Sequence, residues 1–311
     1  MADDRIWAYL LPLSYNMGND RQTTERDERT IYTPYLRFDE SLWNDMLPKL
    51  VEAGVNMIVI DLCDGVRYQS HPEIALPDAW SPEKLRTELD RMREHGIEPI
   101  PKLNFSATHD VWLGKYSRML STAAYYTVVR DLIAEVVDLF DGPRFFHLGM
   151  DEETAQHQRH HAFAVMRQHG LWWHDFNLMV DAVEKSGSRA WIWSDYVWHH
   201  PDEFVANMSK RVLQSNWYYG ERFSDFRGLE ETHVTAYDLL EKHGFDQIPT
   251  GSNHSNTVNF KGTVEYCERH VDSARLLGYF MTVWRPTTEQ YRTAHMEAIQ
   301  LVAEACREIG K

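Results

Sequence analysis

The chain has 311 residues, and its 47 acidic and 32 basic side chains give a net charge of −15 at pH 7. This acidic balance argues against nucleic acid as a partner, because such binding depends on Lys and Arg side chains that neutralise phosphates. No run of residues approaches the ~20 apolar positions of a membrane helix, so we expect no membrane partner. The acidic start of the chain lacks the basic and apolar regions of a signal peptide, which predicts a cytoplasmic protein.

Short apolar runs alternate with amphipathic stretches along the whole chain, a pattern typical of βα units and a parallel sheet. The expected strands cover residues 6–13, 56–62, 98–105, 144–150, 189–197, 212–219, 246–251 and 277–284. The expected helices cover residues 39–53, 82–95, 123–140, 174–185, 201–208, 236–243, 261–276 and 289–309. One helix is well delimited, since Ser81-Pro82-Glu83 combines an N-cap with a proline at the first helical position and Gly96 stands just past its end.

Eight strands alternating with eight helices predict a single (β/α)8 TIM barrel over residues 1–311. A doubly wound sheet would carry a glycine-rich phosphate loop after its first strand, but residues 14–20 contain neither GxGxxG nor a P-loop. We therefore expect no nucleotide or other cofactor. Active sites of such barrels lie at the C-terminal ends of the strands, which selects the residues to inspect.

Aromatic residues make up 13% of the chain, with 11 Trp, 15 Tyr and 13 Phe. They could fill a large core or form a stacking surface for the apolar faces of sugar rings. Trp193, Trp217 and Trp284 fall at the ends of the fifth, sixth and eighth expected strands. Core layers of a barrel use Val, Ile and Leu, so this placement favours a ring of indoles around one mouth of the barrel and a carbohydrate substrate.

Three consecutive acids, Asp151-Glu152-Glu153, directly follow the fourth expected strand. Such a run is usually a solvated loop, but Gly149 permits a turn next to a ligand. Carboxyl groups packed in a Trp-lined pocket have their pKa values pushed apart, which leaves one protonated as a general acid. Glycoside hydrolysis requires a pair of this kind.

The chain from about Phe38 to Trp284 resembles the catalytic barrel of family 20 glycoside hydrolases, the β-N-acetylhexosaminidases. The family pattern H-x-G-x-D-E is matched by residues 147–152, at the end of the fourth strand where the family carries it. Residues 65–67 and 71–73, Gly-Val-Arg and His-Pro-Glu, resemble the family's G-x-R and PE stretches.

This resemblance implies that Glu152 is the general acid/base and that Asp151 orients the 2-acetamido group, whose oxygen is the nucleophile. It also implies roles in binding the substrate for residues at the other strand ends. These are the indoles of Trp193, Trp217 and Trp284, the phenol of Tyr218 or Tyr219, and the polar groups of Asp64, His109 and Asp195.

Several positions depart from the family pattern. Lys102 and Asn104 replace two acids of the third strand. The first strand does not end in an arginine, and Arg21 is the only candidate in the residues that follow it. Arg285 and Pro286 follow the last tryptophan, where the family often has a glutamate. These positions hold the terminal sugar in the family, so the sugar and the exo or endo action stay open.

Two other readings stay open beside the hydrolase. One is a sugar-binding barrel without catalysis, and the other is a metal-dependent sugar isomerase, suggested by the 16 histidines. No HExxH motif is present, and histidines adjacent in sequence seldom converge on one ion, so we expect no metal. A homodimer that shields the site is a further expectation for a barrel without an added domain.

Overall fold

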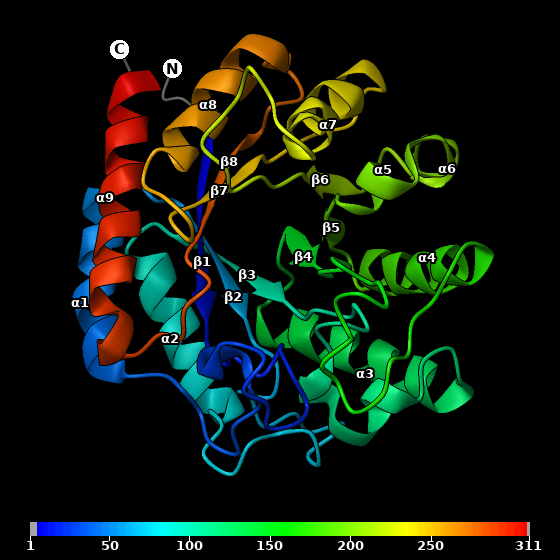
Figure 1. Cartoon of the computed structure of the whole chain (residues 1–311). Coiled ribbons are helices and arrows are strands. Elements are labelled where there is room, and N and C mark those ends of the chain that lie inside the picture. The colour runs from blue at the N-terminus through cyan, green and yellow to red at the C-terminus, as the bar shows by residue number, and fades with distance from the viewer. Residues whose placement is uncertain (1–4, 310–311) are drawn as a thin grey trace.

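The computed structural model describes residues 5–309, and its eight parallel strands form one curled sheet (Figure 1). The strands are β1 (Ile6–Pro12), β2 (Met57–Asp61), β3 (Glu98–Lys102), β4 (Phe145–His147), β5 (Arg189–Trp193), β6 (Leu213–Ser215), β7 (Thr250–Ser252) and β8 (Gly278–Thr282). They pair in the order β6-β5-β4-β3-β2-β1-β8-β7. Single bridges from Gln214 to Gln247 and from Trp217 to Thr250 join the two remaining edges. The predicted (β/α)8 TIM barrel is confirmed.

Helices surround this sheet (Figure 1). They are α1 (Glu40–Glu52), α2 (Pro82–Glu94), α3 (Ala123–Leu139), α4 (Gly170–Lys185), α5 (Tyr196–His199), α6 (Pro201–Asn207), α7 (Glu230–Lys242), α8 (Asn259–His270) and α9 (Arg292–Ile309). Helix α2 has the predicted ends, because Ser81 Oγ accepts the N–H of Lys84 and Gly96 has a φ of 74°. None of the helices in residues 5–309 is long and apolar enough to cross a membrane.

The inside of the barrel holds large apolar side chains and one ion pair. Trp191, Trp193 and Phe280 belong to the inner cluster of buried residues. The ammonium group of Lys102 pairs with the carboxylate of Asp61, and both side chains are fully buried. Buried charges of this kind are tolerated only when each has its partner, so β2 and β3 depend on one another here.

Two long loops meet over the C-terminal ends of the strands. The loop after β1 (residues 13–38) contacts the loop after β4 (residues 148–169), where Asp20 accepts the N–H of Ala162 at 2.8 Å. Glu25 of the first loop pairs with His160 of the second, with 2.5 Å between Oε2 and Nδ1. These contacts fix the position of the β1 loop beside the end of the barrel where function is expected.

Candidate active site

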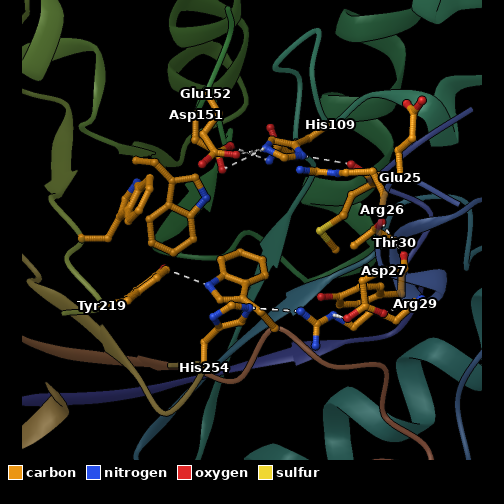
Figure 2. Close-up of a pocket in the computed structure, with 17 residues that line it drawn as sticks. Glu25, Arg26, Asp27, Arg29, Thr30, His109, Asp151, Glu152, Tyr219 and His254 are labelled. Atoms are coloured by element: carbon orange, nitrogen blue, oxygen red, sulfur yellow. Dashed lines mark hydrogen bonds and ion pairs between the residues drawn. The ribbon is translucent and has the colours of Figure 1, made fainter. Parts of the chain in front are cut away.

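A cavity of about 530 Å³ lies at the C-terminal end of the barrel and is lined by three kinds of side chain (Figure 2). One wall is aromatic, with Trp193, Trp217, Tyr219 and Trp284. Asp151, Glu152 and His109 lie together at another side, and the β1 loop supplies a charged wall. This volume is within the range of ligand pockets for small molecules.

A tight turn precedes the three consecutive acids that follow β4. The backbone turns sharply before them, since Gly149 has a φ of 72° and Met150 one of 75°. A side chain at Gly149 would collide with Asn104, because a Cβ would lie 2.0 Å from Asn104 Oδ1. Glycine therefore allows both this turn and the close approach of Asn104.

Asp151 is held by the third strand's loop. Asn104 Nδ2 donates to Asp151 Oδ1 at 2.7 Å, while Asn104 Oδ1 accepts the N–H groups of Ser106 and Met150 at 3.0 and 3.2 Å. Asp151 is nearly buried, with 7% of its surface exposed. Its second oxygen, Oδ2, lies 3.4 Å from His109 Nε2.

Glu152 shares His109 with Asp151. Glu152 Oε2 lies 3.3 Å from His109 Nε2, and Oε1 lies 3.4 Å from His157 Nε2. Burial acts to raise the pKa of Glu152, but the nearby His109 and His157 outweigh it and hold this pKa below the usual range. Glu152 is therefore ionised at neutral pH.

The proton of this group resides on His109. Its Nδ1 lies 2.9 Å from the carbonyl oxygen of Met17, to which it donates. Burial opposes the charged imidazolium, yet the carboxylates of Asp151 and Glu152 raise the pKa of His109 to about 9. His109 is therefore a charged imidazolium at neutral pH, next to Asp151 and Glu152.

Asp195 supports this arrangement from the loop after β5. Its Oδ2 accepts the backbone N–H of Glu152 at 2.8 Å, and its Oδ1 accepts the indole N–H of Trp217 at 3.3 Å. Burial and then the charge of Asp151 raise the pKa of Asp195 to about 8. The side chain does not line the cavity, but it links the acid pair to the aromatic wall.

The aromatic wall is a connected set of rings. The indole N–H of Trp284 donates to the Tyr219 hydroxyl at 2.8 Å, and the Tyr219 ring stacks on Trp217 with centroids 5.0 Å apart. Trp193 lies edge-on to Trp284, with a centroid distance of 5.9 Å. These contacts restrict the rings, so the wall is rigid before a ligand binds.

The third acid, Glu153, has a structural role. Its Oε1 accepts the Nε–H of Arg167 at 2.8 Å, its Oε2 accepts the Nη2–H at 2.5 Å, and both side chains are almost fully buried. Oε2 also accepts the N–H of Ala107 at 3.1 Å. This bidentate pair holds the β4 loop against the β3 loop.

Two more expected site residues lie outside the cavity, as Asp195 does. Asp64 is buried beside Ser14 and Asn16, whose side chains donate to its carboxylate at 2.6 and 2.9 Å. The ring of Tyr218 packs edge-on against Phe223, so Tyr219 is the phenol that faces the cavity.

The sequence interpretation missed several residues of the cavity. Arg21 is exposed and pairs with Glu25 at 3.8 Å, while Arg26 and Arg29 line the cavity in its place. His254, from the loop after β7, lines it as well. Their residue types and positions in the sequence did not indicate a place in the cavity, because only the folded loops bring them to the strand ends.

His109, Asp151 and Glu152 could also hold a metal ion. Their ligand atoms lie within 4.8 Å of one another, the only such group among residues 5–309. A histidine must be deprotonated to bind a metal, so an ion at this place would displace the proton of His109.

No protein-family model and no curated protein sequence matches this chain. Its fold is similar to that of solved enzymes. A GH20 exo-β-N-acetylglucosaminidase from Vibrio harveyi superposes with a TM-score of 0.64 at 14% identity, covering 97% of this chain and 54% of that one. The N-acetyl-β-hexosaminidase of Streptomyces plicatus gives 0.65 at 11% identity, with coverage of 96% and 62%. Dispersin B gives 0.61 at 13% identity, with coverage of 96% and 98%.

These likenesses concern the fold. The chain spans about half the length of the Vibrio harveyi enzyme but nearly the whole of Dispersin B. The barrel architecture that the sequence predicted is therefore the one that β-N-acetylhexosaminidases of this family use.

Proposed function

We propose that this chain is a retaining β-N-acetylhexosaminidase that uses the 2-acetamido group of its substrate as the nucleophile. One observation carries the proposal. Asp151 and Glu152 lie 3.4 and 3.3 Å from the same imidazole nitrogen, beside the aromatic wall of a cavity at the C-terminal end of the barrel. The similarity of fold to enzymes with this activity supports it.

In the first step Glu152 protonates the glycosidic oxygen while the acetamido oxygen attacks C1 from the opposite face. The C1–O bond breaks, the aglycone leaves as an alcohol, and an oxazolinium-like intermediate remains. Asp151 Oδ2 accepts the acetamido N–H and stabilises the positive charge that forms on this group. In the second step the Glu152 carboxylate takes a proton from water as the water attacks C1, which returns the β configuration.

Glu152 must be protonated for the first step, although its lowered pKa leaves it ionised at neutral pH. We assign this proton to His109, whose Nε2 lies 3.3 Å from Glu152 Oε2. The aromatic wall excludes water around the acetamido group and packs against the apolar face of the sugar.

The test uses 4-nitrophenyl N-acetyl-β-glucosaminide and its galacto isomer with wild type and Glu152→Gln. Loss of the general acid should lower kcat/KM by about 10²–10⁴. Glu52→Gln, on the exposed side of α1, makes the same chemical change and should leave kcat/KM unaltered. Wild-type turnover by Glu152→Gln would exclude this residue as the acid.

Acetamido participation is tested by the N-trifluoroacetyl analogue, whose carbonyl oxygen is a weaker nucleophile. Its kcat should fall strongly, and a thiazoline analogue of the intermediate should inhibit. Equal rates on the analogue or on the 2-hydroxy glucoside would refute substrate assistance. Sugar binding without hydrolysis would favour the non-catalytic barrel. Isomerisation of a free sugar that requires an added divalent metal would favour the isomerase.

A further inference from the structure

His109, Asp151 and Glu152 bring one imidazole nitrogen and two carboxylate oxygens together at the side of the cavity (Figure 2). The atoms are His109 Nε2, Asp151 Oδ2 and Glu152 Oε2. Imidazole nitrogens and carboxylate oxygens are both ligands of Zn²⁺ in proteins, and catalytic zinc sites use three protein ligands with an open fourth position. The group therefore has the composition of a zinc site with one side open to the cavity.

The distances within this group match metal ligation better than hydrogen bonding. His109 Nε2 lies 3.4 Å from Asp151 Oδ2 and 3.3 Å from Glu152 Oε2. A charge-assisted N–H···O bond measures about 2.7–2.9 Å, whereas two ligands of a tetrahedral zinc ion, each about 2.1 Å from the metal, lie about 3.4 Å apart. His109 Nε2 is buried without a hydrogen-bond partner in the described part of the chain, so this nitrogen is available to an ion.

Hydrogen bonds outside the group orient two of its three ligands. His109 Nδ1 donates to the carbonyl oxygen of Met17 at 2.9 Å, which leaves Nε2 as the nitrogen that faces the carboxylates. Asn104 Nδ2 donates to the other oxygen of Asp151 at 2.7 Å, and Asp151 is only 7% exposed. Ligands of metal sites have such outer partners, and a ligating histidine commonly donates its second ring N–H to a backbone carbonyl.

Glu152 is the adjustable ligand. The three ligand atoms lie within 4.8 Å of one another, and 27% of the Glu152 side chain is exposed, so rotation of this side chain brings its carboxylate to an ion held by the other two. The two carboxylates carry the charge that balances a divalent cation. Ca²⁺ and Mg²⁺ prefer shells made of oxygen ligands, whereas an imidazole ligand suits zinc.

We propose that this group binds Zn²⁺ through His109 Nε2, Asp151 Oδ2 and Glu152 Oε2, and that the bound ion inhibits the enzyme. The inhibitory role rests on the proposed function. The ion releases the proton of His109 to solvent and occupies the two carboxylates that would act on the glycosidic oxygen and the acetamido group. Substrate and ion need the same oxygens, so each excludes the other and the inhibition is competitive.

Calorimetric titration with ZnCl₂ measures the binding of the ion without any turnover. Wild type should bind one equivalent of zinc that His109→Gln and Asp151→Asn bind at least a hundredfold more weakly, because even an outer partner of a ligand contributes about 10–100-fold to metal affinity. His95→Gln removes an exposed histidine at the end of α2 and should keep that equivalent, which controls for zinc on surface histidines. Equal zinc titrations of wild type and both site variants would overturn the proposal.

Inhibition is measured on 4-nitrophenyl N-acetyl-β-glucosaminide at increasing zinc concentration. The apparent KM should rise while kcat stays constant, the inhibition constant should equal the Kd from calorimetry, and EDTA should restore the activity. The same concentration of Mg²⁺ should have no effect. Activation by zinc, a fall in kcat at constant KM, or equal inhibition by Mg²⁺ would overturn the proposal.

The two measurements separate this proposal from the proposed function. A zinc equivalent that depends on His109 and Asp151, with no hydrolysis of any glycoside by wild type, refutes the hydrolase and keeps the ion site. Hydrolysis that zinc leaves unchanged, with equal zinc titrations of wild type and both site variants, refutes the ion site and keeps the hydrolase.

Discussion

The proton held by His109 leads to a prediction about the pH dependence of catalysis. His109 faces Asp151 and Glu152 at 3.4 and 3.3 Å, and its pKa is raised to about 9. While this group keeps its proton, Glu152 can receive it when substrate binds. The basic limb of kcat/KM for wild type should therefore lie near pH 9.

His109→Gln removes both the proton and the positive neighbour of Glu152. Glu152 must then bind its own proton, so the basic limb should move to the pKa of this carboxyl group. Each pH unit by which this limb lies below pH 8 should lower kcat/KM at pH 8 about tenfold, because only the protonated fraction of Glu152 can act as the acid. At pH 5 the loss should be much smaller.

The same replacement should change how stability depends on pH. A histidine whose pKa is raised from about 6.5 to about 9 on folding stabilises the protein fully below pH 6.5, and this contribution disappears as the pH rises through 9. This rise in the pKa corresponds to at most roughly 3 kcal/mol of stability. Solvent screening reduces that figure, because the side chain is 18% exposed. Urea unfolding at pH 6 and 9.5 measures this contribution, with exposed His95→Gln as the control.

The pH profile of catalysis decides whether His109 holds the proton that Glu152 uses. If the basic limb of kcat/KM stayed near pH 9 in His109→Gln, this reasoning would be refuted.

Two further replacements test the supporting charges. Lys102→Met leaves the buried carboxylate of Asp61 unpaired and should lower the free energy of unfolding by roughly 3–5 kcal/mol in urea titrations, with recovery when Asp61→Leu is added. Asp195→Asn removes a carboxyl group whose raised pKa, about 8, makes folding less favourable as the pH rises from 4 to 8. The stability of this variant relative to wild type should therefore be greater at pH 8 than at pH 5, and equal differences at both pH values would contradict the raised pKa. Its kcat/KM should fall, because one N–H, that of Glu152 or Trp217, loses its acceptor.

The order of elements was predictable, because each strand and helix carries its own periodicity. Helix α3, expected over residues 123–140, spans Ala123–Leu139. The element ends near the site were less predictable. The fourth strand, expected to reach residue 150, ends at His147, since the backbone at Gly149 and Met150 leaves the extended conformation.

The members of the site were partly predictable, because a barrel brings strand ends together. Trp193, Trp217 and Trp284 do line one cavity with Asp151 and Glu152. Contacts that join distant loops left no local signal. The bond of Asn104 to Asp151, the pair of Glu153 with Arg167, and the presence of Arg29 in the cavity depend on loop conformations that only the fold defines.

The backbone of the acid pair is strained, and the bonds that stabilise it come from residues outside its own motif. Met150 and Glu152 have φ values of 75° and 55°, a region that costs a non-glycine residue about 1–2 kcal/mol. The N–H of Met150 is bound by Asn104 from the third strand's loop, and that of Glu152 by Asp195 from the fifth. Each bond contributes about the energy needed to hold one strained residue. The geometry of Asp151 and Glu152 is therefore set by the neighbouring loops, and a chain with the same six-residue motif but without these two acceptors would not present the pair in this way.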